Sequence, residues 1–264
     1  RDCHSVCSSL ASRIKTPSCL QLPVPFYPYS TPNQELNTMR SQDIKYTTRN
    51  NEAFDGYLTA PDGDGKYPGL LYITAISGAD ETNQKLGDAW AADGFVVSMP
   101  DIFWRQHPGP TSDMAIAQAR YKAFDAEQGM LDIEDIIDDL KTHPNCNGKI
   151  AVVGYCFGGR YAHLCAARLD VGAVGAFHGT KIGLHLDETK NITCPVSYHF
   201  GEVDNSIPMD EIDAIKASYA DHANAEIAVY EGQAHNFSTP GKPAYDSDVA
   251  KTSRDAVLRC FRSM

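Results

Sequence analysis

The sequence has no apolar run that approaches the ~20 residues a membrane-spanning helix needs. Its longest apolar stretches, such as GLLYITAISGA at 69–79, have the length of a strand. It is also poor in cations, because 23 Lys and Arg face 34 Asp and Glu among 264 residues, a net charge of −11. A general binder of nucleic acid or anionic membranes needs a basic face. We therefore expect neither kind of partner.

The eight cysteines form no CxxC pair, and the histidines show no ligand spacing, so no metal site is expected. A chain of this length can bury a full core without disulfides. We interpret most cysteines as small buried residues in a reduced compartment, and we expect a cytoplasmic protein, since no signal-peptide pattern is visible. Three cysteines precede residue 39 and five follow it: Cys3, Cys7 and Cys19, then Cys146, Cys156, Cys165, Cys194 and Cys260.

Residues 1–38 differ in composition from the rest of the chain. They hold five of the 15 prolines and six serines, and they show no usable periodicity. Composition of this kind favours a poorly ordered leader, added ahead of a domain that spans 39–264. The alternative is an arm that packs on the domain through Phe26, Tyr27 and Tyr29.

From residue 43 onward, the apolar pattern predicts an antiparallel strand pair and then alternating helices and strands. Segments 43–48 and 54–60 alternate like half-buried strands. Continuous apolar runs predict six more strands, at 69–74, 95–100, 149–155, 171–179, 195–201 and 225–232. Helices are predicted at 82–94, 130–141, 157–169, about 208–221 and 243–263. The fold class is therefore α/β, with a mostly parallel sheet of about eight strands and helices on both faces.

The motif Gly154-Tyr155-Cys156-Phe157-Gly158-Gly159 lies between a predicted buried strand and a predicted helix. A nucleophile elbow needs this strand–turn–helix context, and it needs small residues beside the nucleophile because the turn is tight. Here Cys156 takes the position of the nucleophile, and the helix N-terminus favours its thiolate form. The alternative is a buried cysteine before a glycine-rich helix start.

Two further chemical groups follow predicted strands. Asp204 comes just after the strand 195–201, and His235 comes just after the last strand. The carboxyl ends of parallel strands meet at one edge of the sheet, so both side chains are expected beside Cys156. The chain order nucleophile, acid, base is that of α/β-hydrolases.

With these motifs, GYCFGG, GEVD and GQAHNF, the sequence resembles the dienelactone hydrolase family over roughly residues 40–263. The resemblance implies an α/β-hydrolase fold and no cofactor. It implies that Cys156 is the nucleophile, that His235 is the general base and acid, and that Asp204 orients His235. It also implies an oxyanion hole formed by the backbone N–H groups of Ile76 and Phe157.

The sequence departs from the family pattern at the substrate positions. Ala75 stands where the family has a carboxylate that holds the resting thiol. Ala117 and Thr239 stand where dienelactone hydrolases proper have two arginines that bind the substrate carboxylate. Arg120 lies one helical turn after Ala117 and is a candidate for partial replacement. We expect that selective binding of an anionic lactone is lost.

The segment 104–124 is a long crossover that is either an ordinary loop and helix or a cover over the ligand-binding edge. Interpreting it as a cover makes Trp104, Arg120 and Tyr121 candidates for the pocket, together with Ser77.

The favoured function is a cofactor-free hydrolase of neutral esters or lactones, which works through a covalent cysteine intermediate and extends to phosphotriesters. The alternative is a redox-sensing thiol protein, because a reactive thiolate is also prone to oxidation. A non-catalytic binding module on the same scaffold is the third hypothesis. The oligomeric state stays open at this point, a homodimer included.

Overall fold

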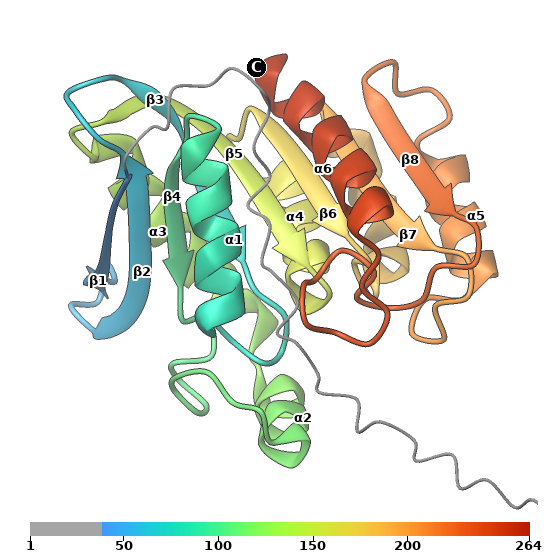
Figure 1. The fold of residues 1–264 in the computed structure, drawn as a ribbon, viewed down its shortest axis with the longest axis horizontal. Helices are drawn as coiled ribbons and strands as arrows, with labels where there is room; N and C mark the ends of the chain where they lie inside the picture. Colours follow the sequence, from blue (N-terminus) through green and yellow to red (C-terminus); the bar gives the residue numbers. More distant parts are fainter. Residues whose placement is uncertain (1–38) are drawn as a thin grey trace, which may run out of the picture.

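The computed structural model describes residues 39–264, so the predicted leader or packed arm at 1–38 lies outside the described residues. Eight strands form one sheet in the order β1-β2-β4-β3-β5-β6-β7-β8 (Figure 1). Strand β2 pairs antiparallel with both β1 and β4, and every other pair is parallel. The predicted fold class is confirmed. The strands are β1 Met39–Thr47, β2 Ala53–Pro61, β3 Tyr67–Ile73, β4 Val96–Pro100, β5 Cys146–Tyr155, β6 Ala173–Phe177, β7 Val196–Gly201 and β8 Ala225–Tyr230.

The helices cover both faces of this sheet. In Figure 1, α1 and α6 lie in front of it, while α3, α4 and α5 lie behind it. Two apolar clusters match these layers: one contains Trp90 and Phe261 from the front helices, and the other contains Ile133 and Leu164 from the rear helices. The helices are α1 Glu81–Ala92, α2 Met114–Ala123, α3 Ala126–Thr142, α4 Phe157–Arg168, α5 Met209–Ser218 and α6 Ser247–Arg262.

The continuous apolar runs fold as central strands because helices cover both of their faces. All five residues of β4 and all five of β6 are buried. Helix α3 buries Ile133, Ile136, Ile137 and Leu140 on one face, as the helical spacing of its apolar residues predicts. No helix among residues 39–264 is long and apolar enough to cross a membrane.

The crossover contains a loop and a separate helix, α2, which lies beyond the lower end of the sheet in Figure 1. The structure differs from the expected elements in two places. A 3₁₀ segment over Ile182–Asn191, with a kink at His185, follows β6 and has no apolar period that would predict it. Helix α6 begins later than expected because the Asp246 side chain caps it, accepting hydrogen bonds from the N–H groups of Asp248 and Val249.

Candidate active site

Cys156 occupies a sharp turn between β5 and α4. Its backbone has φ 54° and ψ −113°, a conformation that costs free energy in any residue but glycine. The turn is tight enough that a Cβ on Gly154 would lie 2.1 Å from the carbonyl oxygen of Gly158. A Cβ on Gly158 would lie 2.1 Å from the carbonyl oxygen of Ile73 in β3. Both glycines are therefore required for this turn, which places Cys156 at the N-terminus of α4.

Asp204 and His235 meet at the same edge of the sheet, each in the turn that follows its strand. Nδ1 of His235 donates to Oδ2 of Asp204 at 2.7 Å. The other oxygen of this carboxylate accepts the backbone N–H of Ser206 at 2.8 Å. The Asp204 side chain is fully buried, so these bonds fix both its position and the orientation of the imidazole.

The protonated form of His235 is favoured in this setting. Burial lowers its pKa, but hydrogen bonds with Asp204 and Cys156 and the charges of both partners raise the pKa to about 10. His235 therefore keeps its proton through neutral pH when Cys156 is its thiolate partner. The three side chains can hold a thiolate–imidazolium–carboxylate arrangement, which is a nucleophile ready to attack.

A second histidine packs against His235. The ring of His178 lies edge-on at 4.7 Å between centroids, and His178 is fully buried. Its Nε2 shares a hydrogen bond with the Ser238 hydroxyl at 3.1 Å. Burial, and then the charge of His235, hold the pKa of His178 well below its usual value, so a neutral ring lies beside the charged one. No sequence pattern indicates this contact, because His178 belongs to no recognisable motif.

A cavity of about 480 Å³ opens at this edge of the sheet. It is bordered by the β3–α1 turn, by α2, by the elbow and by the loops that carry Asp204 and His235. The residues expected here by sequence are Ile76, Ser77, Tyr121, Cys156, Phe157 and His235, with Ala75, Ala117 and Thr239 at the positions of the missing charged groups. The assignment of the Ile76 and Phe157 N–H groups as an oxyanion hole stays a prediction.

Two expected pocket residues lie elsewhere. The Arg120 guanidinium is buried away from the cavity and donates to three main-chain carbonyl oxygens, those of Ile76, His107 and Gly109. Trp104 stacks on Phe54 and donates from its indole N–H to Asp132 at 3.1 Å. These carbonyl groups lie in loops and have no hydrogen-bond partner in a neighbouring strand. The long Arg120 side chain therefore extends toward them and away from the cavity. Arg120 therefore does not replace either missing substrate arginine.

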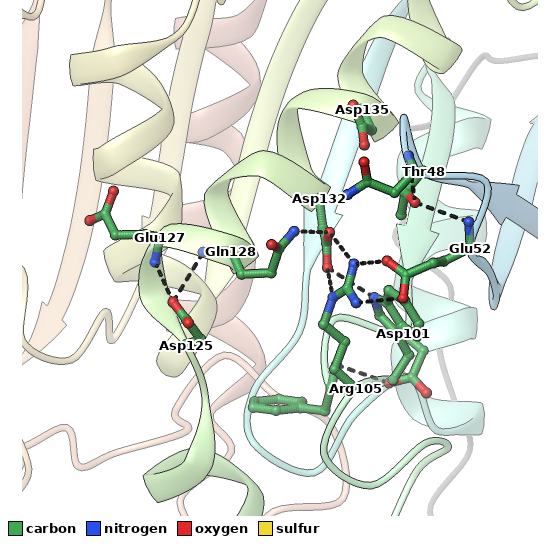
Figure 2. Close-up of polar contacts among 12 residues, drawn as sticks. Thr48, Glu52, Asp101, Arg105, Asp125, Glu127, Gln128, Asp132 and Asp135 are labelled. Atoms are coloured by element: carbon green, nitrogen blue, oxygen red, sulfur yellow. Dashed lines mark hydrogen bonds and ion pairs between the residues drawn. The ribbon is translucent and has the colours of Figure 1, made fainter.

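Asp132 is the centre of a separate polar cluster on the outer side of the molecule (Figure 2). It accepts hydrogen bonds from Arg105 at 2.9 Å and from Gln128 at 2.9 Å, and Arg105 also pairs with Glu52 at 2.7 Å. The cluster ties the crossover to α3 and to the β1–β2 turn. The hydrogen bond to Asp132 explains the position of Trp104, which therefore has no contact with the cavity.

Sequence reasoning missed two cationic side chains that border the cavity. Lys181 and Lys242 both line it, and the Lys181 ammonium lies 4.9 Å from the centre of the Tyr121 ring. Both lie in loops without motif, so only the fold shows that they reach the site. Within the described residues, no group of three or more His, Cys, Asp or Glu side chains could hold a metal ion.

Comparison with known proteins agrees with this geometry. A family model, described as the dienelactone hydrolase family, matches residues 54–264. The chain is 27% identical over 226 residues to carboxymethylenebutenolidase 1 of Cupriavidus pinatubonensis, covering 83% of this chain and 96% of that one. It is 24% identical over 233 residues to a carboxymethylenebutenolidase of a Pseudomonas species, covering 86% and 97%.

Solved structures share the fold. A crystal structure of a Klebsiella pneumoniae protein matches with a TM-score of 0.79 and 23% identity, covering 86% of this chain and all of that one. A dienelactone hydrolase-like promiscuous phosphotriesterase from metagenomic libraries matches with a TM-score of 0.72 and 19% identity, covering 85% and 98%.

The raised pKa of His235 predicts an unusual pH dependence for the alkylation of Cys156. The helix N-terminus and the imidazolium both favour the thiolate form of Cys156, and beside that thiolate His235 keeps its proton up to a pKa of about 10, so we expect an ion pair across neutral pH. We expect the rate of inactivation by iodoacetamide to change by less than about threefold between pH 6.5 and 8.5. In His235→Gln the thiol has no imidazolium partner, so its rate should fall roughly tenfold per pH unit below the ordinary thiol pKa of ~8.5.

Asp204→Asn provides an intermediate case, since it keeps His235 but removes the charge that raises its pKa. Its profile should lie between the other two. Parallel profiles for the wild type and His235→Gln would show that no ion pair exists.

Proposed function

The chain belongs to the dienelactone hydrolase family, and from this we propose that it hydrolyses neutral esters or lactones through a thioester on Cys156. The observation that carries the proposal is the meeting of three strand-end groups at one cavity. Asp204 is bonded to His235 at 2.7 Å, and His235 faces the thiol that begins α4. The proposed reaction uses only the side chains and backbone of this chain, with water as the second reactant.

In the first half of the reaction, the Cys156 thiolate attacks the carbonyl carbon, and the carbonyl π electrons move to oxygen. The backbone N–H groups of Ile76 and Phe157 are proposed to bind that oxyanion. As the tetrahedral intermediate collapses, the carbon–oxygen bond to the alcohol breaks, and Nε2 of the His235 imidazolium donates its proton to the leaving oxygen. The products of this half are a free alcohol and a thioester.

In the second half, neutral His235 takes a proton from water, and the hydroxide formed attacks the thioester carbon. Collapse of this second intermediate breaks the carbon–sulfur bond. The carboxylic acid leaves, and the thiolate and imidazolium are restored. Asp204 stabilises the imidazolium in both halves without itself taking a proton.

The cavity supports a preference for neutral substrates. Ala117 and Thr239 lie in its wall, and Arg120 is engaged with backbone carbonyls instead of reaching the cavity. Within the part of the chain that the structure describes, the wall beside Cys156 therefore offers no guanidinium to a substrate carboxylate. The ammonium groups of the described lining residues are those of Lys181 and Lys242, and Lys181 lies over Tyr121.

Phosphotriester hydrolysis is a second proposed activity. A structural neighbour is described as a promiscuous phosphotriesterase, and a soft thiolate that faces an oxyanion hole can attack phosphorus as well as carbon. The redox alternative is less favoured, because Cys156 is the only thiol among residues 39–264 that lines the cavity. A cytoplasmic location and a homodimeric state stay predictions.

Removal of single triad groups tests the catalytic assignment. Cys156→Ala should abolish turnover of an aryl ester, and Asp204→Asn should lower kcat by orders of magnitude, because triad residues act as one unit. Cys156→Ser need not restore activity, since a hydroxyl needs a stronger base than a thiol. Retention of a tenth of the wild-type rate by Cys156→Ala would remove Cys156 as the nucleophile.

A side-by-side measurement of kcat/KM for a neutral aryl ester, an aryl phosphotriester and a dienelactone tests the substrate class. A charge-assisted hydrogen bond contributes ~1.5–3 kcal/mol, and ~1.4 kcal/mol corresponds to tenfold in rate. The absence of two guanidinium contacts should therefore place the anionic dienelactone orders of magnitude below the neutral ester.

The double variant Lys181→Met, Lys242→Met is the matched control for this comparison. It should leave the neutral ester unaffected. If the dienelactone is the better substrate of the wild type and loses that advantage in the double variant, the lysines bind its carboxylate and the preference for neutral substrates is wrong.

A further inference from the structure

The Arg120 side chain is the most deeply buried charge beside the proposed site. Arg120 is 1% exposed, and among residues 39–264 no carboxylate forms an ion pair with it. Burial lowers its pKa, and the charge of Asp101 opposes that shift. A buried cation is costly unless hydrogen bonds compensate it, so the groups that surround this guanidinium must do so.

Main-chain carbonyls supply that compensation. Nε of Arg120 donates to the Ile76 carbonyl oxygen at 2.8 Å, and Nη2 donates to the same oxygen. Nη1 donates to the carbonyl oxygens of Gly109 at 2.7 Å and His107 at 3.2 Å. The guanidinium also lies over the Phe103 ring, 4.6 Å from its centre. One side chain thus joins α2, the crossover after β4 and the turn after β3.

The turn after β3 is built around these bonds. The N–H of Gly78 donates to the carbonyl oxygen of Ala75 at 3.0 Å, which closes the turn, and the N–H of Thr111 donates to the Ser77 carbonyl oxygen at 2.8 Å. Gly78 has φ 81°, and a Cβ there would lie 3.0 Å from Nη2 of Arg120. The guanidinium therefore occupies the outer side of a turn whose inner side borders the cavity.

Ile76 connects the guanidinium on the outer side of this turn with the cavity on its inner side. Its carbonyl is held by two nitrogens of Arg120, and its N–H is the group assigned to the oxyanion hole. Without the guanidinium the Ile76 carbonyl would lose its partner, and the peptide plane between Ile76 and Ser77 would be less restrained. The adjoining plane, which carries the Ile76 N–H, would then be held only by the bond from Gly78 to Ala75. Small misplacements of catalytic groups, of about 1 Å, can cost ~100-fold in rate.

We propose that Arg120 is a positioning residue that sets the oxyanion hole by holding the Ile76 carbonyl from behind. The proposal rests on the hydrolase function proposed above. It assigns Arg120 no contact with substrate, and it explains why this cation is buried in loops instead of lining the cavity.

The first test compares Arg120→Met with Arg105→Met. Arg105 is a matched control, since it lies on the same crossover and makes ion pairs with Asp132 and Glu52 that do not involve the turn after β3 (Figure 2). With 4-nitrophenyl acetate, Arg120→Met should lose about 100-fold in kcat with KM changed by less than about threefold. Arg105→Met should keep kcat within about threefold, even if its melting temperature falls.

Alkylation separates the oxyanion hole from the nucleophile. Iodoacetamide reacts with the thiolate without forming an oxyanion, so its rate in Arg120→Met should stay within about threefold of the wild type. An equal loss of alkylation and of kcat would indicate general disruption of the site and would overturn the proposal, as would an unchanged kcat. If Arg120→Met does not fold, Arg120→Lys keeps the charge without the planar fork, and a wild-type kcat in that variant counts against the proposal.

Amide hydrogen exchange gives a readout that does not depend on hydrolysis. The amides of residues 76–78 should exchange at least about tenfold faster in Arg120→Met than in the wild type, and Arg105→Met should leave them unchanged. Unchanged exchange in Arg120→Met would overturn the positioning role. If the wild type itself hydrolyses no ester, the proposed function fails, while this measurement still decides whether Arg120 holds the turn.

Discussion

The close packing of α4 against β3 and β5 is the constraint on which the site depends. Neither Gly154 nor Gly158 has room for a Cβ, since backbone atoms of the neighbouring segment lie 2.1 Å from where each would stand. This contact forces Cys156 into its positive φ and aims its thiol away from the sheet, into the cavity. Strands β7 and β8, which lie on the same side of β5 in the sheet, then bring Asp204 and His235 to the same edge. A packing requirement deep in the core thus determines where the chemistry takes place.

The sequence predicted the parts of this structure that repeat or that follow strands. Continuous apolar runs showed the central strands, and the order of Cys156, Asp204 and His235 at strand ends predicted their meeting, because parallel strands share a carboxyl edge. Direction of a long side chain was not predictable in the same way. Its place in the sequence predicted Arg120 at the cavity, but the guanidinium lies outside it and donates to the Ile76 carbonyl oxygen. That carbonyl has no other hydrogen-bond partner in the turn, which is evident only from the folded structure. Sequence reasoning missed His178 and Lys181 for a related reason, because only the tertiary fold brings these two residues to the site.

Charge is distributed unevenly around the cavity of this acidic chain. The proposed nucleophile, Cys156, and its proposed base, His235, lie together, and the buried Asp204 accepts a hydrogen bond from His235, while a neutral histidine, His178, lies beside them. On the far side of the turn after β3, the positive charge of Arg120 is neutralised by carbonyl dipoles and not by a carboxylate. Among residues 39–264, the cavity wall itself contains no arginine. This arrangement is better suited to stabilising the transient negative charge of an oxyanion than to binding the permanent negative charge of a substrate carboxylate.

We propose that Cys156 carries the acyl group during turnover. The most direct test is to mix the protein with a slowly deacylated aryl ester, quench with acid within the first turnover, and measure the mass of the intact chain and of the peptide that contains Cys156. We expect a mass increase equal to one acyl group, located on Cys156, which appears as a burst with the released phenol and is absent from Cys156→Ala. Product formation by the wild type with no adduct on Cys156 at any time, or an adduct on another residue that persists in Cys156→Ala, would contradict it.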